Sequence, residues 1–129
     1  MRLLLDTHIL VWLVTADARL PPALVPALAE HDLTISAASL WELAIKHHLG
    51  KLPSVGPLLA DVAGVTESLG ASILNITPGH ALRAGALAWA HRDPFDRMLV
   101  AQALEEALPL VTLDERLMDW QETPVFAWR

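Results

Sequence analysis

The chain has 129 residues, is 53% hydrophobic and carries a formal net charge of −6 at pH 7. This length and apolar content suit one substantial core, so we expect a single domain over residues 1–129. The absence of cysteine excludes disulfides, thiolate metal sites and cysteine nucleophiles. The acidic surplus disfavours nucleic-acid binding, which normally requires clustered Lys and Arg, unless the carboxylates gather around divalent cations that attract phosphate.

The apolar runs are much shorter than the roughly 18–20 residues that a membrane-spanning helix needs. Residues 3–5 follow the basic Arg2, as in a signal peptide, but Asp6 and His8 interrupt the run. We therefore expect a cytoplasmic protein without membrane association.

In the first part of the chain, short apolar runs alternate with segments of helical periodicity. Residues 3–5 predict a buried strand, and the apolar positions within 9–13 recur at helical spacing. Pro22 favours a helix start in the segment that ends near Glu30. Residues 33–35 predict a second strand.

The same alternation continues along the chain. Ser36 is a good N-cap for a helix that runs to Gly50, a typical stop. We expect a further helix over residues 54–69 and a strand over residues 72–74.

Prolines introduce the last helices. Pro78 opens one helix, and Pro94 precedes apolar residues that recur at helical spacing from 95 to 104. Residues 110–112 predict a fourth strand and residues 125–126 a short fifth one. Strands that alternate with helices predict an α/β fold in which helices cover both faces of a parallel sheet.

Four acidic residues stand at positions where this fold brings side chains together. Asp6 and Asp114 follow predicted strands, Asp96 begins a helix, and Glu42 lies in a helix that starts just after a strand. The carboxyl ends of parallel strands form one edge of the sheet, where sites usually lie. Each Asp alone is equally typical of an N-cap or turn, and Glu42 alone of an ion pair with Lys46 one turn later.

Converging carboxylates repel one another, and a hard cation relieves that repulsion. Mg²⁺ or Mn²⁺ prefers carboxylate oxygens and suits phosphodiester hydrolysis by activated water. A zinc site is disfavoured because the spacing of His47, His48, His80 and His91 contains no pair of zinc ligands one helical turn apart.

Four motifs carry a family resemblance. They are Leu-Leu-Leu-Asp-Thr-His at residues 3–8, Ser-Leu-Trp-Glu-Leu-Ala-Ile-Lys at 39–46, the segment around Asp-Pro-Phe-Asp-Arg within 91–103, and Val-Thr-Leu-Asp at 111–114. In order and spacing they closely resemble the PIN-domain toxins of the VapC type. The Asp-Pro-Phe-Asp-Arg segment is the most specific of them.

The resemblance implies a three-layer α/β/α sandwich with a small central parallel sheet. It also implies metal-dependent cleavage of RNA and a cognate antitoxin that blocks the site. Asp6, Glu42, Asp96 and Asp114 match the family's acids, so the resemblance makes them the catalytic and metal-binding set.

Other residues of the motifs are candidates for roles beside these acids. Asp93 joins the metal shell, caps the helix at Pro94 or pairs with a neighbouring arginine, and we favour the cap. Thr112 matches a hydroxyl position near the metal but is also an ordinary strand residue. Thr7 lies where it can reach the same edge, beside Asp6.

The basic residues near the motifs are candidate RNA contacts. Arg97 either binds phosphate with its guanidinium or forms a surface ion pair, and Arg92 and Lys46 are further candidates. The high apolar content and five tryptophans favour a homodimer. We expect Trp12 and Trp41 in the core, whereas Trp120 and Trp128 are candidates for an exposed pair that stacks on bases or serves an interface.

Two other functions fit parts of the sequence. A PIN-fold module that only binds proteins needs no intact acid set, but all four acids are present. A metal-dependent phosphatase-like hydrolase with Asp6 as nucleophile usually shows Asp-x-Asp-x-Thr, and position 8 is His instead.

Overall fold

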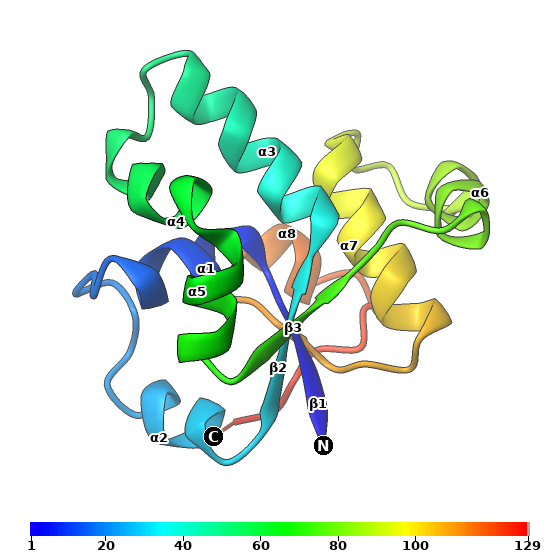
Figure 1. Ribbon diagram of the computed structural model, residues 1–129. Coiled ribbons are helices and arrows are strands. Elements are labelled where there is room, and N and C mark those ends of the chain that lie inside the picture. The colour runs from blue at the N-terminus through cyan, green and yellow to red at the C-terminus, as the bar shows by residue number, and fades with distance from the viewer. Residues whose placement is uncertain (129) are drawn as a thin grey trace.

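A four-stranded parallel sheet lies at the centre of the computed structural model, which describes residues 1–128 (Figure 1). The strand order is β3-β2-β1-β4, so β1 is central. Leu4 of β1 pairs with Thr34 of β2 on one side and with Leu110 of β4 on the other. The strands are β1 (Arg2–Leu5), β2 (Asp32–Ser36), β3 (Ala71–Leu74) and β4 (Leu110–Val111).

Helices connect the strands and cover both faces of the sheet, which confirms the predicted α/β sandwich (Figure 1). The helices are α1 (Thr7–Val14), α2 (Leu24–Ala29), α3 (Ala37–His48), α4 (Gly56–Ala60), α5 (Val62–Ser68), α6 (Pro78–Ala86), α7 (Pro94–Glu105) and α8 (Glu115–Met118), and a 3₁₀ turn, η1 (Pro53–Val55), precedes α4.

Alternation along β1 divides the core into two clusters. Leu3 and Leu5 are fully buried in one cluster, with residues of α1 to α5. Leu4 is fully buried in the other, with Leu99 of α7 and Leu117 of α8. Successive side chains of a strand point to opposite faces, so one short apolar strand serves both halves of the core. Within residues 1–128, every helix is too short or too polar to span a membrane.

Two predicted elements were wrong. Residues 54–69 form three short elements rather than one helix, because Asp61 has an extended φ of −146° and its side chain caps α5 by accepting a hydrogen bond from Gly64 N. Residues 125–126 do not form a strand; Val125 makes only an isolated bridge with Leu110. Pro124 beside it has no N–H to donate, which limits a longer ladder.

A buried polar network fixes the position of α7 against the sheet. Ser36, at the end of β2, donates its hydroxyl hydrogen to Gln102 Oε1, and Gln102 is fully buried. The amide nitrogen of Gln102 lies 3.3 Å from His80 Nδ1 on α6. Because unpaired buried polar groups are unfavourable, this network holds β2, α6 and α7 in one arrangement.

Candidate active site

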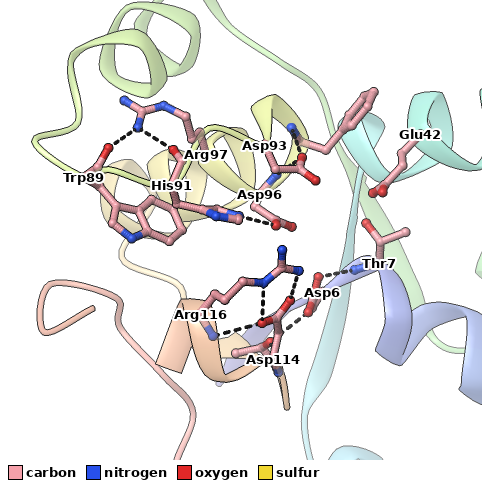
Figure 2. A network of polar contacts seen from close by, with 12 residues as sticks. Asp6, Thr7, Glu42, Trp89, His91, Asp93, Asp96, Arg97, Asp114 and Arg116 are labelled. Atoms are coloured by element: carbon pink, nitrogen blue, oxygen red, sulfur yellow. Dashed lines mark hydrogen bonds and ion pairs between the residues drawn. The ribbon is translucent and has the colours of Figure 1, made fainter. Parts of the chain in front are cut away.

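Carboxylates from four different elements meet at the carboxyl edge of the sheet. Asp6 follows β1, Asp114 follows β4, Asp96 lies in the first turn of α7, and Glu42 lies in α3. Figure 2 shows the side chains of Asp6, Asp96 and Asp114 directed toward one space, with Glu42 beside it. The topology therefore brings together the four acids that the sequence singles out.

Three aspartates also begin helices, which explains their positions locally. Asp6 accepts a hydrogen bond from Thr7 N at 2.7 Å, and Asp114 accepts one from Arg116 N at 2.9 Å. Asp93 accepts hydrogen bonds from the backbone N–H groups of residues 95 and 96, which confirms that it is the cap of α7. Helix N-termini present unpaired N–H groups and a positive dipole end, so they favour carboxylates.

Burial and mutual repulsion act on two of these acids. Asp6 is 2% exposed, and its pKa is raised from 3.8 to about 6. Burial is the largest cause and the charge of Asp96 adds to the rise, whereas the hydrogen bond from Thr112 opposes it. Burial likewise raises the pKa of Asp96, against the hydrogen bond from His91, and the charges of Asp93 and Asp114 add to the rise. The site holds negative charge where a cation would be stabilising.

Basic side chains are paired with three of the four acids. His91 Nε2 lies 2.7 Å from Asp96 Oδ2, and Lys46 donates to Glu42 Oε2 at 2.8 Å. Lys46 thus forms the ion pair within α3 that was the alternative to an RNA contact. The guanidinium of Arg116 donates to both oxygens of Asp114, and these hydrogen bonds hold the pKa of Asp114 below its usual range.

The donor chemistry of the site fits a hard divalent cation. The converging groups are carboxylates, which Mg²⁺ and Mn²⁺ prefer, and two of them are buried together against their own repulsion. Within residues 1–128, no three His, Asp or Glu side chains stand ready to hold one ion between them. Asp114, Asp96 and Glu42 are each hydrogen-bonded to a basic side chain, so binding requires some of these partners to be exchanged.

The two threonines occupy different positions. Thr112 Oγ1 donates to Asp6 Oδ2 at 2.7 Å and accepts from Asp114 N at 3.1 Å, so it links the two aspartates. Thr7 is buried, and its hydroxyl lies 2.9 Å from Ser39 Oγ, which ties α1 to α3. Thr112 therefore orients a site carboxylate, whereas the Thr7 hydroxyl joins helices.

Arg97 uses its guanidinium within the fold, and the phosphate contact considered for it stays a prediction. Its guanidinium donates to the backbone carbonyls of four residues, at 2.7–3.0 Å, and in Figure 2 it points away from the carboxylates. These carbonyls belong to Ala84, Leu87, Trp89 and His91. Arg97 thereby organises the segment that leads into α7 and holds His91 next to Asp96. Arg92 is exposed and lines an apolar groove rather than the acidic space.

The predicted positions of the tryptophan side chains were only partly correct. Trp12 is half-buried against the core, but Trp41 is 58% exposed and contacts Phe95 edge-to-face at 4.9 Å, because it lies on the side of α3 turned away from the sheet. Trp120 stacks on Trp89 at 5.0 Å, whereas Trp128 packs against the other core cluster. The last two tryptophans therefore do not form an exposed pair.

Sequence reasoning missed two residues of the site, His91 and Arg116. His91 was not singled out as the partner of an acid, although it stands two residues before Asp93 of the most specific motif. Arg116 follows Asp114 at a spacing of two, as Arg19 follows Asp17, and both pairs form the same fork of hydrogen bonds. The Asp-x-Arg spacing was the sequence feature from which the pairing of Arg116 with Asp114 could have been predicted.

Comparisons with known proteins cover nearly the whole chain. The PIN-domain family model matches residues 3–121, a range that contains all four acids. Ribonuclease VapC22 from Mycobacterium tuberculosis is 33% identical in an alignment over 128 residues, and the alignment covers 97% of each chain. A solved structure titled as a toxin–antitoxin complex from Klebsiella pneumoniae has a TM-score of 0.58 and 20% identity, with 98% of both chains covered. That structural likeness concerns the fold.

Replacing Arg97 tests its role in the fold. We expect Arg97→Met to lower the free energy of unfolding by about 2–4 kcal/mol, because it leaves several carbonyls without their charged donor. Urea denaturation measures the change. Arg83→Met is the control, since Arg83 forms an exposed ion pair with Glu105 at 2.9 Å, of a kind that contributes less than about 1 kcal/mol. Equal losses in the two variants would contradict the assigned role.

The raised pKa of Asp6 makes stability depend on pH. Between pH 3.8 and about 6 the unfolded chain releases this proton before the folded chain does, so ionisation favours unfolding, and the full loss is reached above pH 6. We expect Asp6→Asn, compared with wild type in chelator, to gain stability progressively from pH 4 to 7, by up to about 3 kcal/mol.

Urea midpoints at several pH values measure this difference. Asp17→Asn is the control, because Arg19 holds the pKa of Asp17 at about 2, so that substitution removes a favourable charge. A difference between Asp6→Asn and wild type that stays constant from pH 4 to 7 would show that burial does not oppose ionisation of Asp6.

Proposed function

Because the chain belongs to the PIN-domain family and is a member of the VapC type, we propose that it is a metal-dependent endoribonuclease, the toxin of a toxin–antitoxin pair. The observation that carries this proposal is the meeting of Asp6, Glu42, Asp96 and Asp114 at one edge of the sheet. The similarity to Ribonuclease VapC22 supports RNA as the substrate class. We propose the cytoplasm as the place of action, where RNA substrates are abundant.

In this proposal Asp6, Asp96 and Asp114 hold Mg²⁺ or Mn²⁺, and Glu42 completes the shell or acts through water. A bound divalent cation supplies positive charge that activates water and stabilises the leaving oxygen of a phosphodiester. Thr112 orients Asp6 through its hydrogen bond, and His91 orients Asp96. Asp6 and Asp114 are held at fixed positions as helix caps, so little reorganisation of these two carboxylates accompanies substrate binding.

The partner in this proposal is a cognate antitoxin that blocks the acidic site. A lysine or arginine of the antitoxin among the four carboxylates would substitute for the charge of the metal. The raised pKa values of Asp6 and Asp96 support this, since any cation delivered there relieves repulsion.

We also propose that the protein forms a homodimer, and α3 offers a surface for this contact. Three exposed apolar side chains recur every four residues along α3 and its C-cap, so they form one apolar stripe. They are Trp41, Ile45 and Leu49, which are 58%, 40% and 59% exposed. Beside the stripe, Phe95 and Met98 line an apolar groove. An exposed apolar surface of this kind is typical of an interface. A second copy would also bring its own Arg92 to the RNA path.

The central test removes one charge of the acid set. We expect Asp96→Asn to fold normally by circular dichroism but to lose RNA cleavage by more than about 100-fold, because the amide keeps the shape and loses the charge that retains the cation. Chelator should abolish wild-type cleavage in the same assay.

Asp93→Asn is the matched control, since asparagine caps a helix as well as aspartate does. We expect a much smaller loss of cleavage there. Full activity of a folded Asp96→Asn protein would remove Asp96 from the metal set, and equal losses at both positions would add Asp93 to it.

The dimer is tested by placing a charge in the stripe. We expect light scattering to give a dimer mass for wild type at micromolar concentration and a monomer mass for Trp41→Glu, because the interface would bury the new charge unpaired. Leu82→Glu is the control on α6, where Leu82 is 76% exposed outside the stripe. A monomeric wild type would contradict the dimer, and a dimeric Trp41→Glu would move the interface elsewhere.

A further inference from the structure

Arg116 extends from α8 into the space between the carboxylates (Figure 2). Its Nε donates to Asp114 Oδ1 at 3.1 Å and its Nη2 donates to Asp114 Oδ2 at 2.7 Å. The negative charges of Asp96 and Asp93, besides that of Asp114, also act on this guanidinium and raise its pKa. Arg116 thus neutralises part of the acidic cluster from within the chain.

The pair of Asp17 and Arg19 shows which part of this arrangement is local. It forms the same fork, with Nε at 3.1 Å and Nη2 at 2.7 Å from the carboxylate oxygens. The pKa of Arg19, however, is raised by Asp17 alone. The fork itself therefore follows from the Asp-x-Arg spacing, and of these two arginines only Arg116 also feels the charge of further acids.

The fork affects how Asp114 can bind a cation. Both oxygens of this carboxylate already accept hydrogen bonds from a positive group, and that charge repels any divalent ion that approaches the same oxygens. Asp114 therefore binds either Arg116 or a metal ion strongly, but not both. The guanidinium and the ion compete for one ligand.

The surroundings of Arg116 allow it to leave Asp114 without unfolding α8. Its side chain is 62% exposed, whereas the neighbouring Leu117 is fully buried and anchors the helix in the core. Rotation of one exposed side chain thus suffices. Arg97 and Lys46 are already paired with backbone carbonyls and with Glu42, so they are less available to a substrate.

We propose that Arg116 is a displaceable internal counter-cation, which gives up Asp114 to the divalent metal and then binds the phosphate of the RNA substrate beside it. The planar fork of a guanidinium matches phosphate oxygens as it matches a carboxylate. This inference rests on the proposed ribonuclease function and adds a substrate-binding residue to its site.

Two opposite effects of one substitution test the proposal. Without RNA, we expect Arg116→Ala to bind Mn²⁺ about 5-fold more tightly than wild type by titration calorimetry, because the competing cation is gone. At saturating Mn²⁺, we expect its KM for a short RNA to rise by about 10-fold or more, because a charged phosphate contact is lost. A residue that only supports the fold would not tighten metal binding.

Three further variants sharpen the result. Arg116→Gln repeats the charge removal with a side chain longer than alanine. Arg116→Lys keeps the charge without the fork, so we expect its KM to lie between those of wild type and Arg116→Ala. Arg19→Ala removes the matched fork at Asp17, and we expect neither metal affinity nor KM to change. Circular dichroism confirms that each variant is folded.

The outcomes separate the two proposals. If wild type binds Mn²⁺ and cleaves RNA but metal affinity in Arg116→Ala and Arg116→Gln is unchanged or weaker, the competition is refuted. An unchanged KM in both variants refutes the phosphate contact. If wild type itself binds no Mn²⁺ or cleaves no RNA, the proposed function fails and this inference fails with it.

Discussion

Mutual repulsion among buried carboxylates is the constraint on which the rest of this structure depends. A parallel sheet brings the starts of α1, after β1, and of α8, after β4, to one edge, and an aspartate caps each of these helices. Asp6 and Asp96 are almost fully buried, so neither water nor distance removes the repulsion between them. The backbone N–H of Thr7, the imidazole of His91 and the hydroxyl of Thr112 form hydrogen bonds with these two carboxylates.

Positive charge and hydrogen bonds reach the acids of this edge from two kinds of group, and each has a structural consequence. Backbone N–H groups at helix starts hold Asp6, Asp93 and Asp114, so the acids and the helices position one another. His91, Lys46 and Arg116 each pair with one carboxylate. In the proposed mechanism a cation takes the place of such pairs, whereas the caps stay because their loss would fray a helix. The proposed site thus combines fixed carboxylates with replaceable counter-charges.

The role of α7 shows how far this support extends from the acids. Gln102 anchors the middle of the helix to the end of β2, and Arg97 gathers the carbonyls of the preceding segment. Both residues are polar and neither is a candidate metal ligand. Their hydrogen bonds place Asp96 and His91 against Asp6 and the N-terminus of α8.

A net charge of −6 is compatible with the proposed phosphate-binding site, because local charge decides the potential there.

Local pattern was sufficient to predict the parallel α/β sheet and the cap at Asp93, and together with the family resemblance it singled out four acids that the fold brings to one edge. Short apolar runs, helix caps and motif spacing act over a few residues, and they are visible along the chain. The break at Asp61, the exposed side of Trp41 and the carbonyl partners of Arg97 were not predictable in this way. Each depends on which segments pack together. The same Asp-x-Arg spacing gives Arg19 one acidic neighbour and Arg116 three, because only the folded sheet brings Asp96 and Asp93 to the start of α8.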